Sequence, residues 1–361
     1  MAAPTSRRQL TTGQWNRTLL HRQHLLERAD EDAIDVLDRC VGLQAQEPKA
    51  PFFGLASRVA DFDPGELDAL LIDREVVRVA LLRSTIFLID AEDARWIRPI
   101  AQPLLDTEVA IHERRLTRTA ATDILADAAE LLSGTAMSGA DLGRALAARH
   151  PDDNPSTMVS VARCGLPLVQ IPPRGLWQGS AAPTYQLFDD WVGPGEPAVV
   201  GDEARKELIR LYLRGFGPAT VKGIQSWAGL TRLGSLVAEM EADWELAELA
   251  GPDGERLFDL EGLDIIDEDT PAPVRLLAPF DNVLVAQADR RRIADDDRYR
   301  SLATPNGRSP GFVLLDGRLA GSWRLDDGRV VTDLMIDPPR RQRSELAAEV
   351  ERLQAFCDTA Q

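Results

Sequence analysis

Residues 76–90, VVRVALLRSTIFLID, are rich in β-branched side chains and alternate in character along much of their length. This pattern favours extended chain, and we predict two strands that meet at a turn near Arg83 and Ser84. Ahead of them, the spacing of apolar residues predicts three helices, the second ending near Val41 and the third starting at Pro64. The first part of the chain is therefore expected to form three helices followed by a hairpin.

The same order of elements is predicted twice more, without a residue-level repeat. In the second unit, Ser138 heads a capping-box helix, and LVQI and LWQG flank the turn Pro172–Gly175 as a hairpin. In the third unit, DWELAEL and RLFDLEG flank the turn Gly251–Gly254. Helices followed by a hairpin are the order of a winged helix. We therefore predict three winged-helix units at residues 1–133 (with a helical connector at its end), 134–200 and 201–271.

From about residue 272 the chain is rich in predicted strands. These strands are expected at VRLLAP, NVLVAQ, GFVLLDGRLAGSWRL and RVVTDLMID, and a last amphipathic helix is expected at Ser344–Ala360. The predicted fold class is therefore α+β. It consists of the three tandem winged-helix units and a β-rich C-terminal section at residues 272–361.

The net charge of −17 argues against contact with DNA, because phosphate contacts supply most of the affinity in such complexes. The acidic residues are concentrated in one segment, however: residues 233–270 hold 13 Asp or Glu and one Arg. By contrast, residues 7–28 hold five Arg and one Glu. Local basic faces are thus compatible with the global charge, but the hairpin of the third unit is not expected to face phosphate.

Three well-separated cysteines, Cys40, Cys164 and Cys357, indicate free thiols in a reducing cytoplasm. The four histidines show no metal-ligand spacing supported by other residues, so we predict no metal and no cofactor. No apolar run reaches the ~18 residues of a membrane span, and the N-terminus has no apolar signal core. We expect a cytoplasmic, nucleoid-associated protein without membrane contact.

The segment VGLQAQEPKAP (41–51) follows the second predicted helix and contains residues that stop regular helix. On extended chain, side chains two residues apart point the same way, so Gln44 and Gln46 should project together and Ala45 should turn away. Two amides on one side of a rigid segment can hold a water molecule or read a base edge. The alternative is that they are ordinary polar residues where the chain leaves a helix.

The stretch LQAQEPKAPFFGLASRV (43–59) resembles the signature of the AlkZ/YcaQ family of tandem winged-helix DNA glycosylases, which carry a catalytic Gln-x-Gln or Gln-x-Asp pair there. The sequence departs from that family at Phe87 and Gln287, where many relatives have histidine, and this bears on substrate fit. Four further blocks resemble the family in the right order: PPRGLWQG (172–179), LRGFGPATVKGIQSWAGL (213–230), LLAPFDNVLVAQADRRRI (276–293) and DGRLAGSWR (316–324).

The resemblance implies a monofunctional DNA glycosylase, which we expect to be a monomer, with a concave channel around duplex DNA. Its substrates would be purines alkylated at N7 or N3, extending to bulky adducts and interstrand crosslinks from natural-product alkylators. Such bases are cationic leaving groups, so the enzyme must mainly stabilise an oxocarbenium-like sugar and place water. A glutamine can orient water but cannot act as a general base. We assign Gln46 to the water and Gln44 to the sugar or phosphate.

The candidate DNA contacts are mostly cationic. The densest basic run, Arg290–Arg292, would clamp phosphate beside the lesion. The alternative is a solvated turn whose positive charge is offset by nearby aspartates. Lys49 has the amine that a lyase would need, but nothing near it in sequence supports that role, so we expect a phosphate contact or an exposed position. The candidates are Lys49, Arg174, Gln287, Arg290, Arg291 and Arg292.

Two other functions compete with a glycosylase. A winged-helix transcriptional regulator would need a strongly basic recognition helix and a dimerisation element. The corresponding helix of the third unit, ATVKGIQSWAGL, has only Lys222, and no heptad pattern is present. A non-catalytic interaction module is favoured only by the acidity.

Overall fold

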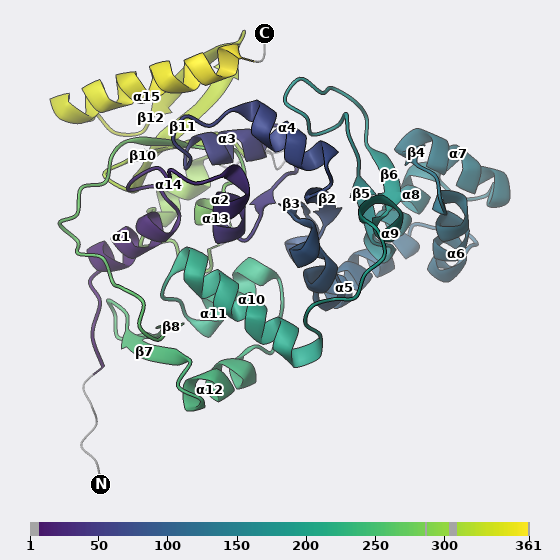
Figure 1. Cartoon of the computed structure of the whole chain (residues 1–361), viewed down its shortest axis with the longest axis horizontal. Helices are drawn as coiled ribbons and strands as arrows, with labels where there is room; N and C mark the ends of the chain where they lie inside the picture. The colour runs from purple at the N-terminus through teal and green to yellow at the C-terminus, as the bar shows by residue number, and fades with distance from the viewer. Residues whose placement is uncertain (1–6, 286, 303–308, 360–361) are drawn as a thin grey trace.

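A computed structural model describes residues 7–285, 287–302 and 309–359 (Figure 1). The first part of the chain contains the predicted helices and hairpin, and one further helix directly after the Gln-x-Gln segment. The elements are α1 Thr12–Arg22, α2 Ala33–Arg39, β1 Leu43–Gln44, α3 Ala50–Ala56, α4 Pro64–Ile72, β2 Val76–Ala80, η1 Leu82–Ser84 and β3 Ile86–Asp90.

Local sequence explains where these elements begin. Thr11 caps α1 in a reciprocal capping box with Gln14, and Pro64 occupies the first turn of α4, as predicted. The hairpin prediction is confirmed, because β2 and β3 pair antiparallel around the short turn η1. Helix α3 was not predicted. Pro51 lies in its first turn, where the missing N–H costs no hydrogen bond.

The second part of the chain shares a sheet with the first. Strand β2 pairs with β5, so one six-stranded sheet has the order β1-β3-β2-β5-β6-β4. Helices α6, α7 and α8 have a core of their own at one end of the molecule (Figure 1). Helix α6 therefore packs with the second unit, although the predicted boundary placed it in the first. The elements are α5 Ala91–Glu113, α6 Ala121–Leu132, β4 Met137–Ser138, α7 Gly139–Arg149, α8 Pro155–Gly165, β5 Leu168–Gln170, β6 Thr184–Leu187 and α9 Phe188–Val192.

The predicted pairing of LVQI with LWQG is wrong. Strand β5 pairs with residues 184–187 instead, and residues 171–183 form the connection. Trp177 is buried within the connection, and its backbone N–H donates to the Asp68 side chain at 2.8 Å. Its ring packs on Phe52 at a centroid distance of 5.1 Å. Tertiary burial of the tryptophan thus overrides the local hairpin pattern.

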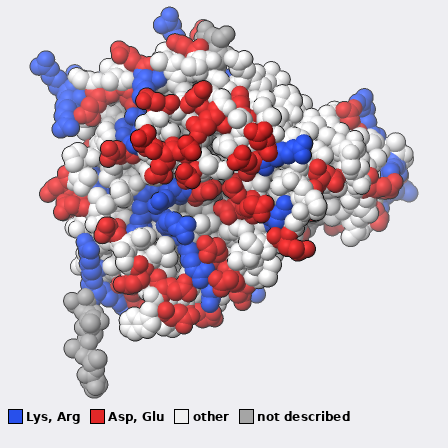
Figure 2. All heavy atoms as spheres, viewed as in Figure 1, with Lys and Arg blue, Asp and Glu red and all other residues white. Residues whose placement is uncertain are grey.

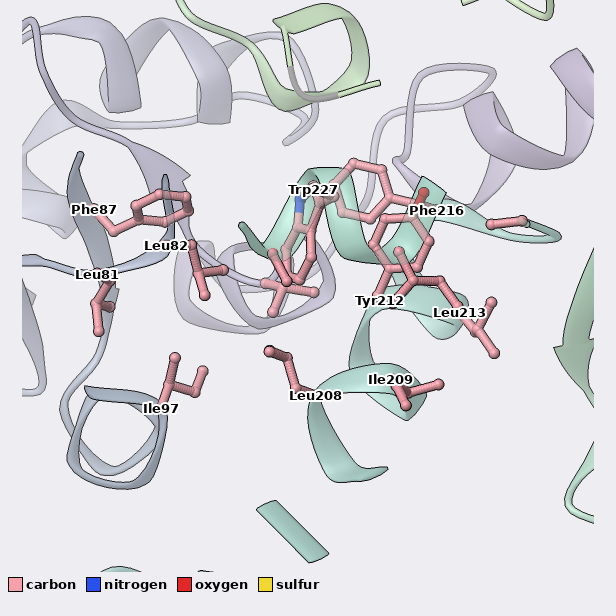
Figure 3. Close-up of a cluster of buried hydrophobic side chains, with 14 of the residues drawn as sticks. Leu81, Leu82, Phe87, Ile97, Leu208, Ile209, Tyr212, Leu213, Phe216 and Trp227 are labelled. Carbon is pink, nitrogen blue, oxygen red and sulfur yellow. The ribbon is translucent and has the colours of Figure 1, made fainter. Parts of the chain in front are cut away.

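The third part consists of α10 Gly201–Phe216, α11 Val221–Ala228, α12 Gly234–Ala242, β7 Leu246–Ala250 and β8 Arg256–Leu260. The predicted acidic hairpin is confirmed, since β7 and β8 pair antiparallel. Figure 3 shows how this part meets the first hairpin: Tyr212, Phe216 and Trp227 cluster opposite Leu82 and Phe87. This shared core fixes the turn η1 against α11.

The C-terminal section has a four-stranded sheet of order β12-β11-β10-β9, along which α15 packs (Figure 1). Its two hairpin turns are confirmed: Asp316-Gly317 and Asp327-Gly328 all have the positive φ that two-residue turns need. The elements are β9 Arg275–Leu277, α13 Asn282–Val285, α14 Asp296–Ser301, β10 Gly311–Leu315, β11 Arg318–Asp326, β12 Arg329–Leu334 and α15 Arg340–Asp358. Residue 360, the predicted end of the last helix, lies outside the described residues.

The predicted strand NVLVAQ is wrong over its first four residues, which form helix α13; residue 286 lies outside the described residues. Asp281 explains the helix, because its side chain accepts from the N–H of Val283 at 3.1 Å and its backbone carbonyl accepts from Leu284 and Val285. Asp281 is itself fixed by Arg58, with two bonds of 2.9 Å between fully buried side chains. A long-range ion pair therefore selects helix over strand.

The molecule is a mixed α/β protein, as expected for the predicted class. Within the described residues, no helix is long and apolar enough to cross a membrane. On the face shown in Figure 2, acidic side chains cover much of the surface and basic side chains form separate groups.

Candidate active site

The Gln-x-Gln segment lies at the edge of the six-stranded sheet. Gln44 is the residue opposite Phe87 in the β1–β3 pairing, and the Ala45 N–H donates to the Ile86 carbonyl at 2.7 Å. Ala45 is fully buried, so its methyl group points into the core. The backbone of the segment is thus fixed to the first hairpin before either glutamine side chain makes a contact.

Gln46 is the exposed member of the pair. Its Oε1 accepts from the Ile86 backbone N–H at 3.2 Å, which restricts the direction of the amide. A carbonyl oxygen has two lone pairs and the amide nitrogen two N–H groups. Gln46 therefore keeps one acceptor site and two donors for a solvent molecule or a substrate.

Gln44 is nearly buried, with 9% of its surface exposed. Its Oε1 accepts from Arg83 Nη2 at 3.1 Å. Because a cationic donor holds the oxygen, the Nε2 group is the part of the amide left to act as a donor. Gln44 is placed to donate a hydrogen bond and Gln46 to accept one.

Arg83 was predicted only as a turn residue and was given no role. It has a left-handed backbone conformation, φ 54°, and its guanidinium donates to the Trp227 carbonyl as well as to Gln44. A third bond goes to Asn282 Oδ1 at 2.8 Å. Within the described ranges it has no carboxylate partner, and burial lowers its pKa to about 10. An arginine at the turn of the hairpin is the sequence signal that points to it.

Gln287 is connected to Arg83 through Asn282. Its Nε2 donates to the Asn282 carbonyl at 3.1 Å, and its Oε1 accepts from Arg292 at 2.9 Å. A chain of hydrogen bonds therefore runs from Gln44 through Arg83, Asn282 and Gln287 to Arg292. Gln287 is buried, so its place in the site is within this chain and not on an open surface.

Two further arginines lie beneath the segment. Arg78 is 1% exposed and donates to the Ala45 carbonyl at 2.9 Å. Burial, and then the nearby charge of Arg174, lowers the pKa of Arg78 to about 10. Arg174 is half-buried and donates to the Ala181 carbonyl at 2.8 Å, so it lies within the connection 171–183 and not at the tip of a short hairpin. Arg78 and Arg83, which donate to the segment, therefore place positive charge close to the glutamine pair, and Arg174 lies near Arg78.

The three arginines of the run 290–292 have separate environments. Arg290 is half-buried and lies over the Tyr299 ring at 4.1 Å. Arg291 is exposed but pairs with Asp289, Asp253 and Glu255. Arg292 is 1% exposed and donates to the Phe216 carbonyl at 2.9 Å. The predicted common clamp does not fit this geometry: Arg292 is a buried structural residue and Arg291 is largely neutralised.

Lys49 is half-buried, with its ammonium nitrogen 4.9 Å from the centre of the Trp177 ring. It lines a cavity of about 390 Å³, together with Glu47, Phe53 and Trp323. Among the described residues, no three His, Cys, Asp or Glu side chains gather as metal ligands. The polar groups described around the Gln-x-Gln segment are the amides of Gln44 and Gln46, the neighbouring guanidinium groups, and the side chains of Glu47 and Lys49.

The chain is similar to known proteins over most of its length. The sequence model of the family "DNA glycosylase AlkZ-like" matches residues 37–356. An interstrand DNA cross-link repair glycosylase from Streptomyces sahachiroi is 24% identical in an alignment of 352 positions, and the match covers 89% of this chain and 90% of that protein. The solved structure of Streptomyces sahachiroi DNA glycosylase AlkZ matches with a TM-score of 0.73 at 20% identity, covering 96% of this chain and 97% of that one. This likeness shows that the fold is shared over nearly the whole chain.

Proposed function

Because this chain belongs to the family of AlkZ-like DNA glycosylases, we propose that it excises cationic purines alkylated at N7 or N3 from duplex DNA. As a DNA glycosylase it hydrolyses the bond between the base and the sugar. The Streptomyces sahachiroi relative is named for interstrand cross-link repair, and we extend the proposal to crosslinked purines. The product would be an intact abasic site, and the protein would act as a monomer.

The observation that carries this proposal is the arrangement of the two glutamines. A cationic purine leaves readily, so the main requirements are a placed water and a stabilised sugar cation. The exposed Gln46 amide, restricted by Ile86, suits the placement of water. The Gln44 amide, with its oxygen bound by Arg83, suits a donor contact to the sugar or phosphate. Neither group can take a proton, which limits the activity to labile adducts.

We also propose that the three predicted units act as winged helices around a concave DNA channel. Arg78 and Arg83 supply positive charge beside the glutamines, whereas acid covers much of the face in Figure 2. Phosphate is attracted to the first region and repelled by the second. DNA would therefore approach the Gln-x-Gln segment, and the buried Arg78 would attract its backbone through charge and not through direct contact.

The proposal is tested with duplexes that each carry one defined N7-alkylguanine of increasing size, together with one crosslinked duplex. We expect free alkylated base and a strand that breaks at the lesion on heating or alkali treatment. Undamaged duplex is the control and should stay intact. Tight binding without release of any base would instead favour a DNA-binding regulator.

We expect DNA affinity to be weak at physiological salt and to fall as salt is raised, because the net charge of −17 opposes binding and the attraction comes from arginine–phosphate contacts. Arg290→Ala should reduce the slope of log affinity against log salt by about 1, the value for one phosphate contact. Arg291→Ala is the matched control, since three carboxylates already occupy that side chain. Titration of labelled duplex across salt concentrations measures both slopes; an affinity indifferent to salt would exclude arginine–phosphate docking.

We expect no covalent protein–DNA intermediate. A lyase needs a neutral amine that attacks C1′, and the chain has three lysines. Lys206 pairs with Glu239 at 3.2 Å, and this hydrogen bond raises its pKa. Because the proposed reaction uses water and no amine, borohydride should trap no adduct during excision. A trapped species would contradict the proposal, and its loss in Lys49→Ala would identify the amine.

A further inference from the structure

We propose that Arg83 is a positioning residue of the glycosylase site: it orients the Gln44 amide so that Nε2 faces the sugar–phosphate backbone beside the lesion. This inference rests on the proposed function and adds to it a residue and a direction. It assigns the hairpin turn η1 a part in the reaction as well as in the fold.

The first step of the argument is the orientation of the amide. Arg83 Nη2 donates to Gln44 Oε1 at 3.1 Å, and a guanidinium has donors but no acceptor. The opposite orientation of the amide would place its NH2 group against the cation. Arg83 therefore selects one of two amide orientations and leaves Nε2 as the outward donor. The natural acceptors for such a donor at an N-glycosyl bond are phosphate and sugar oxygens.

The second step is the rigidity of Arg83 itself. Its guanidinium bridges three neutral oxygens from three segments: the Trp227 carbonyl, Gln44 Oε1 and Asn282 Oδ1. The guanidinium also lies 5.2 Å from the centre of the Phe87 ring. A planar group with five fixed donors can hold this arrangement, and a lysine ammonium cannot reach all three oxygens in the same way.

The third step is charge. No carboxylate among the described residues neutralises Arg83, and its three bonded partners are uncharged. An unneutralised cation in a partly buried site interacts strongly with an approaching phosphate. Asn282 Nδ2 is also buried and has no hydrogen-bond partner among the described residues. The structure thus keeps a positive charge beside Gln44, and Asn282, which Arg83 links to Gln44, adds a donor that is free within the described residues.

The experiment is a double-mutant cycle on single-turnover excision of one N7-alkylguanine, with Arg83→Lys made in the wild type and in Gln44→Ala. In the wild type we expect Arg83→Lys to slow excision about 10²-fold, the usual effect of misplacing one group of an active site. In the Gln44→Ala background, Arg83→Lys should slow excision by less than about threefold, because the amide that Arg83 orients is absent. Arg98→Lys is the matched control: this buried arginine donates to the Cys164 carbonyl at 2.9 Å, far along the chain from the glutamines.

Thermal unfolding of all variants separates positioning from folding. Both arginine changes should lower the unfolding midpoint, but only Arg83→Lys should slow excision beyond the loss of folded protein. Equal rate losses in the two Gln44 backgrounds, or no rate loss at all, would overturn the inference while leaving the proposed function in place. A wild-type protein that releases none of the adducts would overturn the proposed function and this inference with it.

Discussion

Gln46→Ala is expected to excise an N7-alkylguanine about 10²–10³ times more slowly than the wild type, the usual cost of removing one well-placed group from a closed site. DNA affinity should be unchanged, because the exposed amide is assigned to water and the arginines to phosphate. Gln44→Ala should lose somewhat less if its contact is to the sugar or backbone. Single-turnover rates and equilibrium binding on the same duplex measure both effects.

Gln178→Ala is a suitable control for the glutamine variants, since Gln178 is also exposed but lies in the connection between β5 and β6. It should excise at the wild-type rate. If Gln46→Ala lost as much DNA affinity as excision rate, Gln46 would be a DNA contact. Water placement would then have to be assigned to another group.

Asp281→Ala is expected to destabilise the protein by about 3–5 kcal/mol, the cost of leaving one member of a buried ion pair uncompensated. The Arg58 and Asp281 side chains are 1% and 0% exposed and form two bonds of 2.9 Å. Loss of Asp281 also removes the cap of α13, which carries Asn282. Denaturant unfolding measures the change, and excision should fall together with the folded fraction.

The control for this variant is an exposed pair. Arg341 and Glu345 are bonded at 2.8 Å one turn apart on α15, and such surface pairs contribute at most about 0.5 kcal/mol. Glu345→Ala should therefore unfold at nearly the wild-type denaturant concentration. A cost below about 1 kcal/mol for Asp281→Ala would show that water or a rearranged partner compensates Arg58, contrary to the buried pair described above.

Elements with strong local signals were predictable from the sequence. The hairpin at 76–90 and the acidic hairpin around Gly251–Gly254 follow from alternation and turn residues, and the structure has both. The secondary-structure predictions failed where contacts with residues distant in sequence determine the local structure. NVLVAQ has strand-like composition, but the Arg58–Asp281 pair starts a helix there. LWQG loses its strand because Trp177 is taken into a buried aromatic cluster.

The site was predictable only in part, for the same reason. The Gln-x-Gln pair is visible as a short motif, but Arg83 and Asn282 are not. Arg83 lies 39 residues from Gln44 and 199 from Asn282 along the chain. The arginine run 290–292 looked like a phosphate clamp because the acidic turn that pairs with Arg291 lies far away in sequence. Burial and pairing, which decide what an arginine can do, depend on the tertiary fold.

The decisive comparison is the single-turnover release of one defined N7-alkylguanine by the wild type, Gln46→Ala and Gln46→Glu. A carboxylate at position 46 can accept the proton of the attacking water and stabilise the sugar cation. We therefore predict that Gln46→Glu keeps excision near the wild-type rate, or extends it to less labile bases, while Gln46→Ala loses about 10²–10³. If Gln46→Ala excises at the wild-type rate, or Gln46→Glu fails as completely as Gln46→Ala, Gln46 does not place the water.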